Sequence, residues 1–173
     1  MRIGLISDTH IRHPKDLPEQ TADVFAGVDL ILHAGDVCDI RVLDELGRMA
    51  PVIAARGDDD HFGTHDPRVK EEHLLTLEGL TLWLRHRLPF GMVWALNQDE
   101  QTGLADEVLF QCGQAADIVV FGDTHKAVVK RTQGILFVNP GSATLPDYVS
   151  RPGTVAILTL VTGDAEARLV QLE

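Results

Sequence analysis

Short apolar runs that end abruptly in aspartate or histidine restrict the fold of this chain more than any other feature of its sequence. The first run, residues 3–6, is typical of a strand buried on both faces, and the polar stretch after it contains Asp8 and His10. Ligands of open α/β sheets bind beyond the carboxyl ends of the strands. Asp8 and His10 stand two residues apart, so in extended backbone their side chains leave the same face. A carboxylate beside an imidazole can form half of a metal site, although an aspartate at a strand end can also cap the next element.

Four further apolar runs end in the same kind of residue. Residues 29–34 precede Asp36, residues 51–55 precede Asp58, residues 80–84 precede His86, and residues 117–121 precede Asp123 and His125. Packing alone requires no Asp or His at five strand ends, so we predict that these side chains converge on a metal centre. Oxygen and imidazole ligands without thiolate favour Mn²⁺, with Mg²⁺, Fe, Zn²⁺ or Ni²⁺ as alternatives. Two such ions about 3.5–4 Å apart would share a carboxylate, hold a water and neutralise a phosphoryl group.

Composition and charge exclude several other classes of protein. The chain has 173 residues, 45% hydrophobic and 24% charged, as in an ordinary globular protein with a sizeable core. A net charge of −11 argues against nucleic-acid binding, which requires a basic surface. The absence of a Gly-rich loop after the first strand excludes a Rossmann-type nucleotide site. The two cysteines form no disulfide framework, and no signal peptide or apolar span of about 20 residues is visible, so we expect a cytoplasmic protein that does not cross a membrane.

The remaining sequence predicts helices and hairpins around these strands. Helices are expected over residues 19–26, over residues 40–49 after the N-cap Asp39, and over residues 103–111. Hairpins are expected for residues 69–77 with 80–84, 127–131 with 135–138, and 154–161 with 165–172. Strands alternate with helices early and form hairpins late, which predicts a mixed α/β fold with helices outside one mixed sheet or two packed sheets. Because no linker interrupts the chain, we expect a single domain over residues 1–173.

Several short motifs follow one another in a recognisable order. They are Asp8-Thr9-His10, Gly35-Asp36, Arg56-Gly57-Asp58 with two further aspartates, the strand-end His86, Gly122-Asp123-Thr124-His125, and Asn139-Pro140-Gly141-Ser142. This order resembles the calcineurin-like metallophosphoesterases, in particular the small bacterial and archaeal phosphodiesterases, a branch that includes the retromer scaffold subunit of eukaryotes. The resemblance covers most of the chain. It implies a four-layer α-β-β-α sandwich and hydrolysis of a phosphodiester by a metal-bound hydroxide at a dinuclear centre.

The resemblance also implies which residues would hold the ions. The ligands of the first ion would be Asp8, His10, Asp36 and His125. Asp36 would bridge to a second ion, whose other ligands would be Asp58, His86 and Asp123. We take Asp36 and His86 as the candidate catalytic residues, and we expect the turn at residues 139–142 to be structural.

The ligands of the second ion depart from the family pattern. The family usually has Asn in place of Asp58, a histidine in place of Asp123, and Thr-His-Gly-His where this chain reads Arg85-His86-Arg87. The four carboxylates of this chain would offset the charge of two divalent ions, whereas the usual two leave a net charge of about +2 that attracts a phosphodiester. The altered site favours harder ions such as Mn²⁺, Mg²⁺ or Ca²⁺ in the second position.

An alternative is that the second ion is absent. Asp58 and Asp123 would then need another cation, and Arg85 and Arg87 flank the strand-end histidine. We hypothesise that one of these arginines compensates the acidic pair or contacts the substrate phosphate. The competing interpretation for each is a solvated surface arginine.

The loop after the third strand offers further candidates. It has Asp59 where a general acid would stand, so activated diesters with a good leaving group are the substrates expected to be cleaved. His61 or His65 could move toward an ion that lacks its usual histidine, although both are also expected as solvated residues.

Two functions from different classes are compatible with this sequence. The first is a phosphodiesterase that acts on a small phosphate ester. The second is a non-catalytic binding module that keeps the fold and holds a partner through an exposed apolar patch, for which residues 88–96 are the candidate stretch. A homo-oligomer is compatible with either function.

Overall fold

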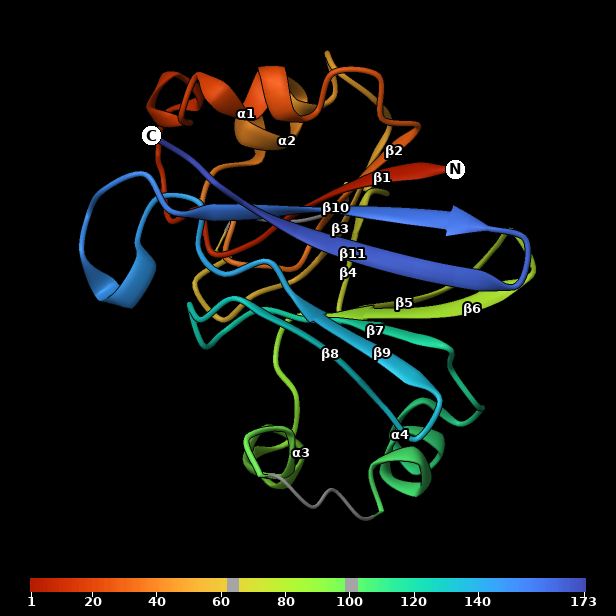
Figure 1. Cartoon of the computed structure of the whole chain (residues 1–173). Helices are drawn as coiled ribbons and strands as arrows, with labels where there is room; N and C mark the ends of the chain where they lie inside the picture. The colour runs from red at the N-terminus through yellow and green to blue at the C-terminus, as the bar shows by residue number, and fades with distance from the viewer. Residues whose placement is uncertain (62–65, 99–102) are drawn as a thin grey trace.

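The computed structural model describes residues 1–61, 66–98 and 103–173. The described strands form two sheets that pack face to face, and helices cover the outer face of each sheet (Figure 1). The layers therefore run α-β-β-α, and an apolar cluster fills each interface between neighbouring layers. This arrangement confirms the predicted fold class.

The first sheet carries the strands that precede Asp8, Asp36 and Asp58. Its order is β11-β10-β1-β2-β3-β4, with bounds β1 Arg2–Ile6, β2 Leu30–His33, β3 Val52–Ala55, β4 Val69–Lys70, β10 Thr154–Val161 and β11 Asp164–Gln171. Strands β1 to β4 are parallel, while β10 is antiparallel to both of its neighbours. Helices α1 (Gln20–Val24) and α2 (Ile40–Leu46) cover its outer face, and the 3₁₀ turn η1 (Pro14–Asp16) precedes α1.

The second sheet carries the strands that precede His86 and Asp123. Its order is β5-β6-β7-β9-β8, with bounds β5 Glu72–Leu77, β6 Leu80–Arg85, β7 Ile118–Val120, β8 Val128–Thr132 and β9 Ile135–Asn139. Strands β6, β7 and β9 are parallel. Helices α3 (Phe90–Leu96) and α4 (Leu104–Cys112) cover its outer face, and the 3₁₀ turn η2 (Pro146–Tyr148) lies in the loop before β10.

The central strands are buried on both faces, which explains their nearly continuous apolar sequence. In β1, Ile3 and Leu5 belong to the cluster between the two sheets, whereas Ile6 packs with Phe25 beneath the first helical layer. Gly4 lies against the ring of Phe25, where an added Cβ would come within 2.9 Å of the ring. The missing side chain at Gly4 therefore lets the aromatic ring rest directly on the strand.

Residues 88–96, the candidate apolar patch, are divided between core and surface. Leu88, Met92 and Leu96 are buried in the cluster beneath α3, whereas Phe90 and Trp94 are 83% and 58% exposed. The stretch is thus an amphipathic helix with two exposed aromatic side chains. Among the described helices, none is both long enough and apolar enough to cross a membrane.

The predicted hairpin of residues 69–77 with 80–84 is correct only in part. Glu72–Leu77 pairs with β6 as expected, but Val69–Lys70 pairs in parallel with β3 in the other sheet. Val69 is buried with the residues beneath α2, and the backbone N–H of Ala54 donates to the Arg68 carbonyl. The chain therefore passes from one sheet to the other between β4 and β5, because each part completes the edge of a different sheet.

The helix predictions are correct in position and differ at their ends. The Asp39 side chain accepts a hydrogen bond from Arg41 N at 2.9 Å, which confirms the predicted N-cap. Helix α2 ends at Leu46, three residues before the predicted end, and the chain continues as turns. The ends of helices fray because their last carbonyl groups lack partners within the helix.

The interface between the sheets predicts where the fold is most sensitive to truncation. Leu82→Ala removes a fully buried side chain between the two sheets and should lower the free energy of unfolding by about 2–5 kcal/mol. Leu74→Ala, on the paired strand but 41% exposed, should lower it by about 1 kcal/mol or less. Urea denaturation of the two variants measures the difference, and equal losses would contradict this assignment of the core.

Candidate metal centre

The five strand ends identified in the sequence meet at one edge of the sandwich. Asp8 and His10 follow β1, Asp36 follows β2 and Asp58 follows β3, so the first sheet supplies one side. His86 follows β6, and Asp123 and His125 follow β7, so the second sheet supplies the other. The parallel strands of each sheet place their carboxyl ends at the same edge, and the packing of the sheets brings the two edges together.

A first group of potential ligands consists of Asp8, His10 and His125. One donor atom from each lies within 4.8 Å of the other two. The Nε2 atoms of His10 and His125 are 3.1 Å apart, and His125 Nε2 lies 3.6 Å from Asp8 Oδ1. Asp8 is completely buried and His125 nearly so, so an ion held there would be largely shielded from solvent.

A second group consists of Asp8, Asp36 and His86, and it shares Asp8 with the first group. Its donor atoms also lie within 4.8 Å of one another. Asp36 Oδ2 is 3.4 Å from His86 Nε2 and 3.4 Å from His10 Nε2. Asp36 therefore lies between the two groups, which is the position that a carboxylate shared by two ions would require.

The electrostatics of this cluster show that it needs a positive charge. Burial raises the pKa of Asp8 to about 6. Burial also acts to raise the pKa of Asp36, but the contact with His86 and the hydrogen bond from Asp59 N lower it to about 2. Burial lowers the pKa of His86, and the neighbouring Asp36 outweighs that effect and raises it to about 9. A proton on His86 thus offsets part of the negative charge of the neighbouring carboxylates, and a divalent ion would offset more of it.

Five buried side-chain nitrogen or oxygen atoms have no hydrogen-bond partner among the described residues, and two of them belong to this cluster. These two are Asp8 Oδ2 and His86 Nε2. Buried polar atoms are nearly always hydrogen-bonded, so two such atoms in one cluster, with His86 Nε2 reaching only Asp36 Oδ2 at 3.4 Å, indicate a ligand. The donor set therefore fits the metal that the sequence predicts.

The histidine rings are oriented by hydrogen bonds from the side away from the cluster. Nδ1 of His86 contacts the Ala34 carbonyl at 2.7 Å, and Nδ1 of His125 contacts the Leu145 carbonyl at 2.7 Å. Such contacts fix the ring so that Nε2 faces the ion. The Ser142 hydroxyl donates to the Asp8 carbonyl at 2.7 Å, so the turn at residues 139–142 supports the backbone behind the centre.

The backbone at these strand ends is in the left-handed region of φ. The values are +50° at Asp8, +47° at His10, +56° at Asp36, +67° at Asp123 and +56° at His125. Each such residue costs on the order of 1–3 kcal/mol when it is not glycine. Of the ten non-glycine residues with positive φ in the described part of the chain, five are therefore residues predicted to bind metal.

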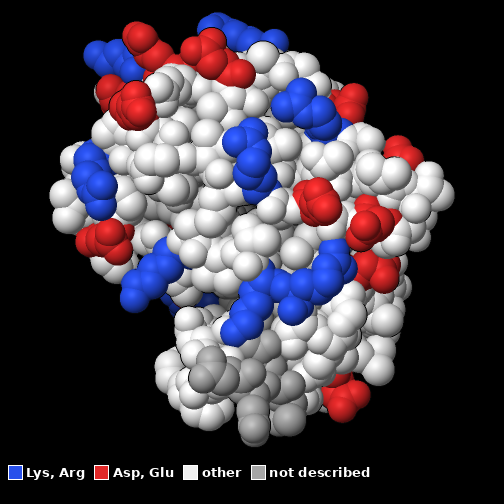
Figure 2. All heavy atoms as spheres, in the orientation of Figure 1, with Lys and Arg blue, Asp and Glu red and all other residues white. Residues whose placement is uncertain are grey.

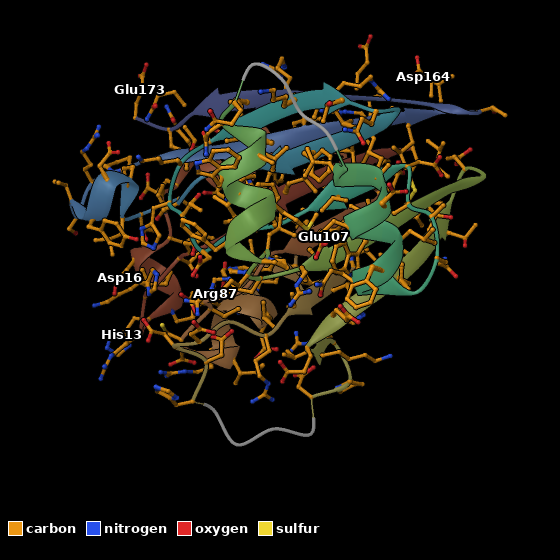
Figure 3. The ribbon with its side chains drawn as sticks, turned by 90° about the horizontal axis from the view of Figure 1, so that it is seen from below. His13, Asp16, Arg87, Glu107, Asp164 and Glu173 are labelled. Carbon is orange, nitrogen blue, oxygen red and sulfur yellow. The ribbon has the colours of Figure 1, made fainter. Side chains whose placement is uncertain are left out.

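Asp58 and Asp123 are held by an arginine. Nη2 of Arg87 forms an ion pair with Asp58 Oδ2 and lies 2.7 Å from Asp123 Oδ1, which Arg87 Nε contacts at 2.8 Å. Neither aspartate belongs to the metal-competent groups found among the described residues. Figure 3 labels Arg87 beside one end of α3. The guanidinium therefore lies between two of the carboxylates that the family resemblance assigns to a second ion.

Arg85 lies elsewhere. Its guanidinium carbon is 5.0 Å from the centre of the Trp83 ring, on the face of β6 that packs toward the second helical layer. The described structure shows no contact of Arg85 with either aspartate.

The loop that follows β3 gives its three aspartates different roles. Asp60 is buried and accepts hydrogen bonds from Gly57 N at 2.7 Å and Cys38 N at 2.8 Å, so it organises the loop. Asp59 is exposed, and its carboxylate lies 3.3 Å from His10 Nδ1. His65 lies outside the described residues.

The ring of Tyr148 stacks on His125 with a centroid distance of 4.3 Å and an angle of 25° between the ring planes. Sequence reasoning missed this contact, because Tyr148 stands in a loop with no motif that connects it to a strand end.

Residues 1–163 match the calcineurin-like phosphoesterase superfamily domain. The chain belongs to this family. A relative from Methanothermobacter thermautotrophicus, named a probable metallophosphoesterase, is 35% identical over 148 residues, which cover 84% of this chain and 79% of the relative.

Two solved structures share the fold of this metallophosphoesterase. An archaeal phosphodiesterase has a TM-score of 0.72 at 21% identity, covering 99% of this chain and all of the other. A Vps29 from Entamoeba histolytica in complex with Zn²⁺ has a TM-score of 0.68 at 23% identity, covering 99% of both chains.

The close approach of Gly35 to the His86 ring allows the geometry of the centre to be tested. A Cβ at Gly35 would lie 2.5 Å from His86 Nδ1, and its φ is +97°. Gly35→Ala should therefore displace the ring, lower the free energy of unfolding by more than about 2 kcal/mol and weaken Mn²⁺ binding in calorimetric titration.

Gly79→Ala is the matched control for this substitution. Gly79 has a similar φ of +80° but has nothing within 4 Å of an added Cβ. Its substitution should cost about 1 kcal/mol from the backbone alone and leave Mn²⁺ affinity unchanged. If Gly35→Ala behaved no differently, the proposed dependence on the His86 ring would be wrong.

Proposed function

We propose that residues 1–173 form a single metallophosphoesterase domain that hydrolyses phosphodiesters with the aid of bound divalent ions. The observation that supports this most is the convergence of Asp8, Asp36 and His86, which includes two buried ligand atoms, Asp8 Oδ2 and His86 Nε2, without a hydrogen-bond partner. Asp8, His10, Asp36 and His125 would hold the first ion, and His86 would contribute to a second. Bound ions would activate water and neutralise charge on the phosphoryl group.

The protein's own groups would position this chemistry. The hydrogen bond from Asp59 N to Asp36 Oδ1, at 2.9 Å, fixes the shared carboxylate. The carbonyl contacts of His86 and His125 keep both Nε2 atoms directed at the site. Because these donors are held before any ligand arrives, little reorganisation is required on binding.

The donor set favours Mn²⁺ over thiolate-preferring ions. Oxygen and imidazole nitrogen supply the ligands of both main groups. Cys38 forms a further metal-competent group with His10 and Asp59, but burial and the neighbouring aspartates raise the pKa of its thiol to about 12, which disfavours the thiolate. Mg²⁺, Fe, Zn²⁺ and Ni²⁺ are the alternatives that metal analysis would distinguish.

Substitution of two predicted ligands, one from each sheet, tests the hydrolase proposal. Asp36→Ala and His125→Ala should each reduce Mn²⁺-dependent cleavage of bis(p-nitrophenyl) phosphate by at least about a hundredfold, because each removes a donor from the centre. Release of p-nitrophenolate measures the rate, and calorimetry on the same samples measures Mn²⁺ binding.

Asp164→Ala and Glu166→Ala are the matched controls, since both residues are exposed on β11 and lie toward the amino end of β1, at the opposite edge of the sheet from the cluster. Both variants should retain the activity of the unaltered protein. A protein that binds Mn²⁺ but turns over no diester with any divalent ion would overturn the hydrolase proposal and favour the binding-module alternative.

We also propose that Arg87 neutralises Asp58 and Asp123 and competes with a second ion for them. Exposed ion pairs contribute about 0.2–1 kcal/mol each. Arg87→Ala should therefore tighten the weaker of two Mn²⁺ sites by a few-fold to about tenfold in calorimetric titration. Arg85→Ala, which removes the guanidinium over Trp83, should leave that affinity unchanged. An unchanged weaker site in Arg87→Ala would contradict the competition.

A further inference from the structure

A cleft opens directly beside the metal centre, on the side of α3. Its volume is about 730 Å³, within the range of sites that bind small molecules. Figure 2 shows the outline of the molecule hollowed at the level of the second sheet, with Lys or Arg side chains beside the hollow. Lys130 Nζ donates to the carbonyls of Leu96 and Gln98, at 2.7 and 3.1 Å, and so ties the end of α3 to β8.

The walls of the cleft are mostly apolar and partly aromatic. They include Phe90 and Val93 from α3, Phe121 from the end of β7, Val128 from β8 and Tyr148 from η2. Phe121 is buried, whereas Phe90 and Tyr148 are 83% and 70% exposed. Exposed aromatic side chains around an apolar hollow are suited to a flat, apolar ligand group.

One end of the cleft borders the candidate metal centre. Arg87 and Asp123 line it, and these are the residues that form the ion pair at the strand ends. Tyr148 belongs to the wall and also stacks on His125, a predicted ligand. A phosphate bound at the centre would therefore extend one of its ester groups into the cleft.

The charged residues that line the cleft are suited to an anionic phosphate. Lys126 lines the cleft as a cation, whereas Arg87 and Asp123 line it as an ion pair, so an anionic phosphate would find one unneutralised cation beside the apolar wall. A ligand with an anionic phosphate at one end and a flat apolar group at the other matches this arrangement.

We infer that this cleft binds the aromatic ester group of the substrate, so that the favoured substrates are phosphodiesters of aromatic alcohols or of nucleosides. The inference rests on the proposed function and names the substrate class for the same site. Phe90 and Val93 form the wall on α3, and Tyr148 forms the wall next to His125. Trp94 and Phe110 are also exposed, but neither lines the cleft.

Binding of two simple diesters to the Mg²⁺-loaded protein tests the inference without requiring turnover. Diphenyl phosphate should bind about tenfold more tightly than dimethyl phosphate, because only the former can bury an aromatic ring. Amide chemical shifts in NMR titrations measure both affinities. The shifts caused by diphenyl phosphate should centre on the start of α3 and on residues near Tyr148.

Phe90→Ala should reduce the preference for diphenyl phosphate at least about threefold, since it removes part of the wall. Phe110→Ala removes an aromatic side chain of similar exposure, 80%, from α4 and should leave the preference intact. Equal affinities for the two diesters, an unmeasurable affinity for diphenyl phosphate, or shifts centred on α4 would each overturn the inference.

Thymidine 5′-phosphate methyl ester in the same titration distinguishes a nucleoside from a simple aryl group. Tighter binding than that of diphenyl phosphate would assign the cleft to nucleosides, and weaker binding would assign it to aryl esters. If the protein prefers the aromatic diester but hydrolyses none, this inference stands and the proposed hydrolysis is wrong. If the protein hydrolyses diesters but shows no aromatic preference, the proposed hydrolysis stands and this inference is wrong.

Discussion

The carboxyl group of Asp8 is completely buried at the end of β1, and the rest of the centre can be understood as a response to that burial. An isolated buried carboxylate is unfavourable, so it must be protonated, paired or bound to a cation. His125 Nε2 lies 3.6 Å from one oxygen, and the backbone N–H of Asp123 donates to the same oxygen at 3.1 Å. The second oxygen has no partner among the described residues. The packing of the sandwich therefore leaves one buried carboxylate oxygen that a bound cation would satisfy.

The strained backbone at the strand ends is part of the same arrangement. Five of the predicted ligands have positive φ, which folds the chain back over the ends of the strands. The hydrogen bonds from Asp8 N to Gly35 O and from His10 N to Asp36 O hold the β1 and β2 ends together in this conformation. The packing of both sheets must supply the free energy that offsets the strain of these turns. The geometry of the centre therefore depends on the whole fold and not on a single loop.

The strand ends could be predicted from sequence because each polar residue follows an apolar run too short to be anything but a buried strand. The strand-switching segment at Val69–Lys70 could not, because local sequence does not encode which sheet an edge strand joins. The two arginines, Arg85 and Arg87, differ in how far their positions could be predicted from sequence. Trp83 and Arg85 stand two apart in β6, so alternation already places Arg85 on the helix-facing side. Arg87 follows the end of the strand, where alternation no longer applies, and only the structure shows its contact with Asp123.

The division of the predicted ligands between the two sheets has a consequence for stability. Asp8, His10 and Asp36 come from one sheet, whereas His86 and His125 come from the other. Any ion held among them is a cross-link between residues as far apart in sequence as His10 and His125. Because such an ion binds only the folded chain, a concentration one hundred times its dissociation constant would add about 2.7 kcal/mol to the free energy of unfolding. A bound ion would thus also stabilise the packing of the two sheets against each other. The melting temperature of the protein would then rise with the concentration of the metal ion.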